Sequence, residues 1–529
     1  MTFFRNIFIG ALASSLFVSG GAQAQRIDLF TQAVAEFAAE HDAIAEFYRT
    51  NGYEAIWTGE DDFDRRQALM TAMAQASFHA LPVTLYNTQD LTQLLSSADS
   101  ARNRGRVEVA LTALYLSYAR DIQTGIIDNP NDIDDGIARR GDHRDPAELL
   151  QELNAGVATE VFANLIPQNP EYTRLMGEKQ RLERLMASGG WGETVPGGKI
   201  EPGDSGSRVI ALRDRLIRLG YLARSASATY DEAMQAAVQA FQQDHGLNID
   251  GVVGESTLAH LNASVEERLR AVIVAMERER WLHRDMDGRQ ILVNLVDYHA
   301  RILDDGVVTF ETRSVVGMNM ADRRSPEFSD EMEHMIINPT WNVPRSIAVN
   351  EYLPQLQENP NAASYLNITD ARGQVVSREE VDFSQYTETD FPFDLSQPPS
   401  NRNALGLVKF MFPNRHNIYL HDTPQDHLFA RERRAYSHGC IRLNEPFEFA
   451  YAILAVQSDD PVGLFHSTLN TGREAQIDLE QHIPVHLIYR TAIIPAQGRP
   501  NYRFDLYGRD AKIWRALQNA GVELGSVQS

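Results

Sequence analysis

The chain has 529 residues but only one cysteine, Cys440. A single thiol cannot form an internal disulfide, so packing and polar contacts alone must hold the fold. Three uses of such a residue are open: a reactive thiol, a bridge to another molecule, or a small buried apolar side chain. The residues around Cys440 must decide among them.

The sequence also lacks basic runs and, after its first 25 residues, long apolar segments. Lys and Arg number 49 against 72 Asp and Glu, which gives a formal net charge of −23. This charge argues against nucleic acid or an anionic membrane as the main partner. No later segment is apolar enough to span a bilayer, so we expect no stable membrane insertion of the mature chain. The length predicts three or four folding units.

The N-terminus has the three parts of a secretory signal. Arg5 supplies the positive charge, residues 7–18 form an apolar stretch, and Ala22-Gln23-Ala24 fits a cleavage site with small flanking residues. We therefore predict a cleaved signal peptide over residues 1–24, with an uncleaved anchor as the alternative. Exported proteins usually carry cysteines in pairs, so export favours a reactive or bridging role for Cys440.

Residues 25–200 show the spacing of amphipathic helices. Apolar side chains recur three, four and seven residues apart in two groups: Phe30, Val34, Phe37, Ile44 and Tyr48, then Val107, Leu111, Leu114 and Tyr118. This period predicts an all-α N-terminal scaffold domain. The segment 188–207 is dense in Gly, Pro and Ser and predicts a linker.

Residues 203–263 predict a compact unit of three short helices. A first helical stripe, formed by Val209, Leu212, Leu216 and Leu219, ends at Gly220. Val238 and Phe241 lie on a second predicted helix. The turn Asp250-Gly251-Val252-Val253-Gly254 then leads into the third.

From residue 264 to 500 the pattern changes to that of a β-rich domain. Apolar and polar residues alternate on both sides of Asp304-Asp305-Gly306, which predicts a hairpin. Further strands are expected over 407–412, 416–423 and 484–494. The polar and aromatic segment 345–403 shows little periodicity, which predicts either a lid or surface elaboration. Residues 501–529 predict a C-terminal helical segment, so the chain as a whole is an α+β multidomain protein.

Cys440 needs a base if its thiol is to attack a carbonyl, because the thiolate is the nucleophile. His438 lies two residues away, where its ring is awkwardly placed for the neighbouring sulfur. His421 ends a predicted strand on the same face as Tyr419, and a strand end can present an imidazole to a facing loop. We predict His421 as the base and a shaping role for His438.

Two further residues next to the thiol have chemistry suited to acyl transfer. Gly439 has no Cβ to crowd a substrate, and its amide, together with that of Cys440, is suited to an oxyanion. Arg442 is suited to a substrate carboxylate or to stabilising the thiolate, and an ion pair with Glu445 is the alternative. A metal site is the rival for this region, but its spacings match no known ligand pattern, so we predict no metal or cofactor. The residues concerned are His416, His421, His427, His438 and Cys440.

At this point a resemblance to a known family is plain. HDTP from His421 and SHGCIRL from Ser437 are similar to the signature of the L,D-transpeptidase catalytic domain. NPTWNVP from Asn338 and NALGLVKFMFPN from Asn403 extend the match, and the unit over 203–263 resembles the peptidoglycan-binding type 1 domain. The whole mature chain resembles the large periplasmic L,D-transpeptidases of Gram-negative bacteria.

The resemblance implies roles for individual residues. It makes Cys440 the nucleophile and His421 the base, with Ser437, His438, Gly439 and Arg442 as motif positions and Tyr419 lining the site. Many members have glycine where this chain has Asp422, and there the backbone carbonyl of that residue orients the imidazole. Asn403, Lys409 and Trp341 lie in the matching motifs and are implied to contact substrate.

The resemblance also implies a reaction and its partners. A cysteine thioester would carry a peptidoglycan tetrapeptide from a donor stem to an acceptor stem in the periplasm, forming a 3→3 cross-link in cell wall biogenesis. Carbapenem β-lactams would inhibit it. An L,D-carboxypeptidase or a lipoprotein-to-wall ligase with the same nucleophile is an alternative. A non-catalytic, wall-binding structural protein is an alternative of another class.

Overall fold

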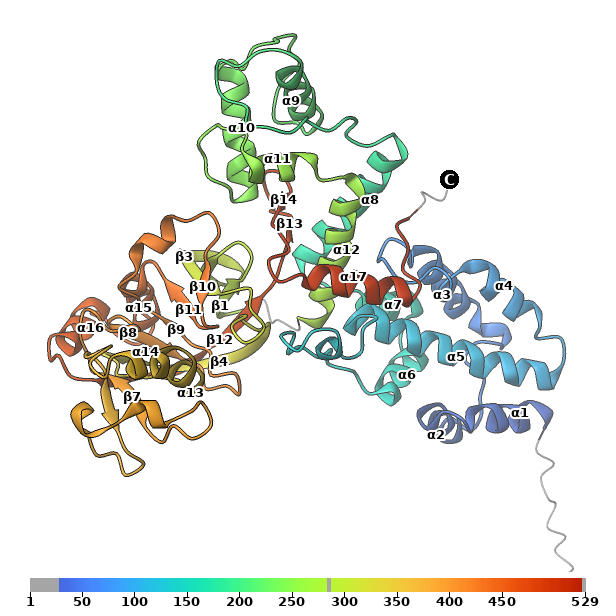
Figure 1. Cartoon of the computed structure of the whole chain (residues 1–529). Coiled ribbons are helices and arrows are strands. Elements are labelled where there is room, and N and C mark those ends of the chain that lie inside the picture. The colour runs from blue at the N-terminus through green and yellow to red at the C-terminus, as the bar shows by residue number, and fades with distance from the viewer. Residues whose placement is uncertain (1–27, 283–286, 526–529) are drawn as a thin grey trace, which may run out of the picture.

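The structure is a computed structural model that describes residues 28–282 and 287–525. The predicted signal peptide lies outside these residues. Figure 1 shows three bodies: helices in blue and cyan on the right, a small green unit at the top, and a yellow-to-orange β-rich body on the left. The α+β class is confirmed by this arrangement. None of the helices in the described ranges combines the length and the apolar composition that crossing a membrane requires.

The N-terminal body is helical, as predicted. The spaced apolar residues Val34, Ile44, Tyr48, Val107 and Leu111 are buried in one core, because their period places them on one face of each helix. The helices are α1 Leu29–Ala38, α2 Asp42–Thr50, α3 Phe63–Gln75, α4 Thr88–Ser96, α5 Ala101–Thr124, α6 Pro146–Ala155, α7 Ala158–Leu165 and α8 Pro170–Ala187.

The small unit contains the three predicted helices, α9 Ser207–Arg218, α10 Glu232–His245 and α11 Glu255–Asn262. The linker prediction for residues 188–207 is wrong in one respect. Val195 and Ile200 are buried in the core of this unit, and Ile200 pairs with Val253. The Gly- and Pro-rich composition correctly predicts irregular backbone over most of this segment, but its few apolar side chains fix the segment onto the helices.

The β-rich body is built on one large sheet. In the described chain nine strands pair in the order β10-β3-β11-β9-β8-β4-β12-β1-β2, and β2 also pairs with β3, so the sheet closes on itself. The predicted hairpin joins β2 to β3, with positive φ at Asp305 and Gly306. The strands are β1 Arg289–Asn294, β2 His299–Asp304, β3 Val307–Gly317, β4 Phe328–Ile337, β8 Val408–Met411, β9 Leu420–His421, β10 Ala435–Ser437, β11 Ile441–Leu443 and β12 Ala475–Ile488, with helices α15 Pro446–Leu454 and α16 Pro461–Leu469.

The segment 345–403 folds into a subdomain of its own, which we call the cap (residues 341–403). Its core is rich in aromatic and aliphatic side chains, among them Leu353, Leu356, Phe383, Phe391 and Phe393. The missing periodicity has a physical cause, because these side chains sit on very short elements. The elements are β5 Trp341–Asn342, α13 Arg345–Ile347, a π-helical turn Ala348–Tyr352, α14 Leu353–Glu358, β6 Asn367–Thr369 and β7 Asp394–Gln397.

The C-terminal segment returns to the other two bodies. A short hairpin, β13 Ala492–Ile493 with β14 Asn501–Tyr502, reaches the small helical unit. The helix predicted within residues 501–529 is α17 Arg509–Asn519. The helix α12 Val265–Trp281 follows directly on the small unit and packs between α8 and α17. Its buried side chains share a core with both helices rather than with the sheet.

A buried cluster of charges joins the helical body to the sheet. Arg278 of α12 lies 3.2 Å from the carboxylate of Glu327, which directly precedes β4. Arg509 of α17 lies 3.3 Å from Glu327 and 3.3 Å from Asp134 of the scaffold, and Arg278 also pairs with Asp510. Because these side chains are almost fully buried, each charge depends on its partners for compensation.

Candidate active site

Three adjacent strands of the large sheet bring the predicted site residues together. In the ladder Lys409 of β8 pairs with His421 of β9, and His421 pairs with Arg442 of β11. Tyr419 and Cys440 lie two residues before His421 and Arg442, so the alternation of a strand places all five side chains on one face. They line a cavity of about 520 Å³, and residues of the cap form another part of its wall.

His421 is held in one tautomer. Its Nδ1 lies 2.5 Å from the backbone carbonyl of Asp422, and because a carbonyl can only accept, Nδ1 carries the proton and Nε2 is left as an acceptor. Burial, with smaller contributions from the charges of Arg442 and Lys409, lowers the pKa of His421 to about 3. The imidazole is therefore neutral at neutral pH and able to take a proton at Nε2.

Cys440 is held as a neutral thiol in the resting site. Its Sγ donates to the carbonyl of Asn417 at 3.5 Å. Burial raises the pKa of the thiol to about 11, although hydrogen bonds from Tyr419 and the charges of Arg442 and Lys409 act in the opposite direction. The resting pair is thus thiol and imidazole rather than thiolate and imidazolium, and the site must remove the thiol proton during attack.

This protonation state predicts the pH dependence of alkylation. Iodoacetamide reacts with the thiolate, and a pKa raised above its usual value keeps the thiolate fraction small and increasing with pH. We expect the alkylation rate of Cys440 to rise about tenfold per pH unit from about pH 7 to about pH 9, without a plateau. Stopped-flow or intact-mass kinetics would measure it, and a plateau already present at neutral pH would show an ion pair instead.

The residues before the thiol shape the loop that carries it. Gly439 has a φ of 120°, a backbone conformation that other residues rarely adopt, and its carbonyl accepts a hydrogen bond from Ser325 at 2.6 Å. Ser437 pairs with Gly317 of β3 and is almost fully buried. The need for glycine at 439 therefore comes from the backbone as well as from the missing Cβ.

His438 contacts the cap. Its Nε2 lies 2.6 Å from the carboxylate of Glu351, and the same oxygen lies 2.7 Å from Arg323. Glu351 is not predicted as a site residue from the sequence, because it is 87 residues from His438 and lies in a segment without periodicity. No local pattern marks it; only the folding of the cap brings this carboxylate to the loop before Cys440.

The remaining predicted residues divide into two groups. Trp341 and Lys409 line the cavity, and Arg442 does so too, donating to Gln425 at 2.6 Å rather than pairing with Glu445. Asn403 is fully buried, and its side-chain amide donates to the backbone carbonyls of three residues, Pro339, Gln397 and Pro398. The structure contradicts a substrate contact for Asn403, which instead fixes the end of the cap to the sheet.

Replacing Glu351 with glutamine should slow the reaction of Cys440 with a substrate without unfolding the protein. The variant keeps the shape but removes the charge shared by His438 and Arg323. Because these groups are about one-third exposed or less, we expect a loss of about tenfold in kcat/KM and an unchanged melting temperature. The exposed Glu358→Gln in the same subdomain should behave as the unmodified protein. Equal rates for both variants would remove this role for Glu351.

Three family models match separate parts of the chain. The L,D-transpeptidase catalytic domain matches residues 288–462, the scaffold domain matches residues 42–178, and the "putative peptidoglycan binding domain" matches residues 205–261. A curated protein of Haemophilus influenzae named "Putative L,D-transpeptidase" is 32% identical over 225 residues, which is 42% of this chain and 45% of that protein. The match thus spans about half the length of this relative.

Two solved structures were also found to be similar. An L,D-transpeptidase fragment from Xylanimonas cellulosilytica is 17% identical, with 56% of this chain and all of that chain covered and a TM-score of 0.17. An L,D-transpeptidase from Stackebrandtia nassauensis is 14% identical, with 56% and 97% covered and a TM-score of 0.23. TM-scores this low carry no argument. The family models show that the chain contains an L,D-transpeptidase catalytic domain, and that a peptidoglycan-binding domain precedes it.

Proposed function

We propose that this protein forms 3→3 cross-links between peptidoglycan stem peptides through a thioester on Cys440. One observation carries the proposal. A lone thiol and an imidazole whose Nε2 has no hydrogen-bond partner among the described residues share one face of adjacent strands, and both line a cavity to which the cap contributes. The transpeptidase and peptidoglycan-binding domains support the same substrate class.

The first half-reaction transfers the donor stem to sulfur. Cys440 attacks the carbonyl after the L-centre of diaminopimelate, and its proton passes to Nε2 of His421. The amides of Gly439 and Cys440 are the proposed donors to the oxyanion. As the tetrahedral intermediate collapses, D-alanine leaves with the proton from His421, and a thioester remains.

The second half-reaction releases the stem to an acceptor. The side-chain amine of a neighbouring stem attacks the thioester, and its proton passes to His421. The Cys440 thiolate then leaves and takes that proton from His421, which restores the thiol. A substrate carboxylate near Arg442 and Lys409 would offset the positive charges that lower the pKa of His421, and so strengthen the base when substrate binds. The basicity of His421 therefore depends on whether substrate occupies the site.

The cap favours the amine over water as acceptor. It supplies residues of one wall of the cavity, including Pro344, Ile347 and Glu351, and excluding water protects a thioester from hydrolysis. An L,D-carboxypeptidase or a lipoprotein-to-wall ligase would share the first half-reaction and differ only in the acceptor. Peptidoglycan as substrate places the enzyme outside the cytoplasm; we propose the periplasm, with residues 1–24 as a cleaved signal, and carbapenems as acylating inhibitors of Cys440.

Incubation with purified sacculi tests the proposal. After muramidase digestion, mass spectrometry should detect 3→3 linked dimers that are absent without enzyme. Release of D-alanine together with tripeptides, but without dimers, would identify a carboxypeptidase. If neither product forms, wall binding is the remaining function.

A further inference from the structure

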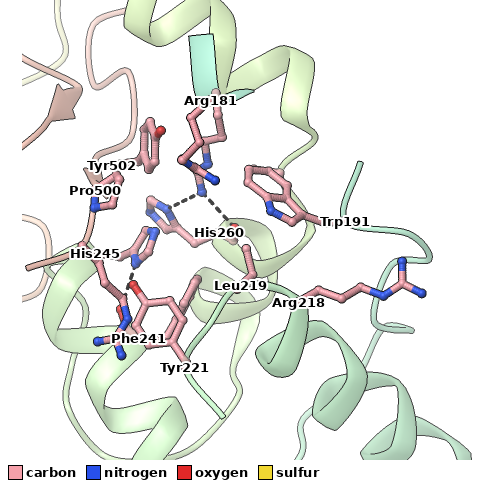
Figure 2. A pocket seen from close by; sticks show the side chains of 13 residues that line it. Arg181, Trp191, Arg218, Leu219, Tyr221, Phe241, His245, His260, Pro500 and Tyr502 are labelled. Carbon is pink, nitrogen blue, oxygen red and sulfur yellow. Dashed lines mark hydrogen bonds between the residues drawn. The ribbon is translucent and has the colours of Figure 1, made fainter. Parts of the chain in front are cut away.

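A second cavity, of about 170 Å³, lies where the peptidoglycan-binding unit meets the rest of the chain. Figure 2 shows its lining side chains. Tyr221, Phe241 and His245 come from the binding unit. They lie near Tyr502 of β14, near Arg181 of α8, and near Trp191, which follows α8. We call it the seam cavity. Since Arg181, Trp191 and Tyr502 lie outside the matched domain of residues 205–261, the cavity exists only in the assembled chain.

Arg268 of α12 is a buried cation at this cavity that forms no ion pair within the described residues, although the charge of Glu267 acts on it from farther away. Only 8% of the residue is exposed. Its Nη2 donates to the carbonyl of His260 at 2.9 Å and to Nδ1 of the same residue at 3.4 Å, and its guanidinium lies 4.5 Å from the ring centroid of Tyr502. No carboxylate of the described residues pairs with it. A buried charge in this state is costly, and an anionic ligand would compensate it.

His260 adds an unused donor beside Arg268. A guanidinium can only donate, so Nδ1 of His260 accepts, and the neutral ring carries its proton on Nε2. Burial, followed by the charge of Arg268, lowers the pKa of His260 and keeps the ring neutral. Nε2 is buried without a hydrogen-bond partner in the described chain. The guanidinium of Arg268 and the Nε2–H of His260 are therefore both available to donate hydrogen bonds to an anion.

The rim of the cavity is also cationic. Arg499 is exposed. Arg218 is exposed too, but Figure 2 shows its guanidinium extending away from the other lining side chains, so Arg499 is the exposed cation of the rim. Arg499 lies 4.5 Å from the ring centroid of Tyr221 and 3.9 Å from Asp244. Arg181 lies there too but pairs with Glu178 at 2.7 Å. In a chain with a formal net charge of −23, this gathering of arginines marks a place suited to an anion.

We propose that the seam cavity binds a carboxylate of a peptidoglycan stem peptide, with the adjoining aliphatic group against the aromatic rings. The volume suits a group of amino-acid size, and one buried arginine matches a single negative charge. The site rests on the proposed function insofar as wall peptide is the substrate class. It would hold a second stem away from Cys440 and raise the local concentration of acceptor stems.

Co-sedimentation with purified sacculi tests this site apart from the chemistry. The full chain carrying Cys440→Ala, which stops turnover, is the parent in every arm. We expect Arg499→Gln to raise the concentration for half-maximal binding about threefold and Arg268→Gln about tenfold or more. Arg208→Gln, an exposed arginine of the binding unit that does not line the cavity, should match the parent.

The controls separate this inference from the proposed function. If Arg268→Gln lowers the melting temperature, Arg499→Gln becomes the deciding variant, because its side chain is exposed. Sacculi with amidated carboxyl groups should bind the parent as weakly as the arginine variants bind untreated sacculi. Unchanged binding by Arg499→Gln and Arg268→Gln would overturn the site, as would full binding of amidated sacculi. Neither result touches the formation of 3→3 dimers by the unmodified chain.

Discussion

Replacing Cys440 with alanine is expected to abolish 3→3 dimer formation in the sacculus assay, a loss of about 10⁴-fold or more. The reason is that no other thiol exists in the chain to form the thioester. The same variant should show no mass increase after incubation with a carbapenem, whereas the unmodified protein should gain one adduct. Cys440 lies in a half-buried position at the cavity, so the melting temperature should change little.

Cys440→Ser is the matched control for this prediction. Serine keeps the shape of the side chain, but its hydroxyl is a far weaker nucleophile next to the same imidazole. We expect activity close to that of Cys440→Ala, with normal binding to sacculi in both. Adduct formation or dimers in the alanine variant would show that another group carries the acyl chain, and the mechanism above would be wrong.

Much of the catalytic site could be predicted because its residues lie close together in sequence. Strand alternation alone places Tyr419 and His421 on one face, and the parallel pairing of β9 with β11 adds Cys440 and Arg442. The contact of His421 with the carbonyl of Asp422 is local as well. What the sequence could not reveal was the charge state, because it depends on how deeply His421 and Cys440 are buried in the folded chain.

Two other features depend on contacts between distant segments. Glu351 reaches His438 only after the cap has folded around its own core. Asn403 lies in a motif typical of the site, yet its amide is used by the backbone of the cap boundary. The segment 188–207 has the composition of a linker, and a few apolar residues within it decide its position. The composition of a segment indicates whether its backbone is regular or irregular, but single side chains determine how the segment packs.

Replacing Glu327 with alanine is expected to give the largest loss of stability, about 3 kcal/mol in the free energy of unfolding. The carboxylate lies among Arg278 and Arg509, whose side chains are 6% and 0% exposed. Its removal leaves two buried guanidinium groups with one carboxylate partner each, Asp510 and Asp134. Urea denaturation followed by tryptophan fluorescence should show a lower midpoint. The transition should also split, because Glu327 joins the sheet to the helical body.

An exposed ion pair a few residues along the chain provides the control. Glu331 lies 3.7 Å from His482, with both side chains about half or more exposed, so Glu331→Ala should change the free energy of unfolding by less than about 1 kcal/mol. Adding Arg509→Met to Glu327→Ala should recover part of the loss, because it removes the cation that Glu327→Ala leaves in excess within the cluster, while Asp134 keeps Lys512 as a partner. If Glu327→Ala unfolds at the same urea concentration as Glu331→Ala, the buried charges do not hold the two bodies together, and the shared helical core around α12 must do so alone.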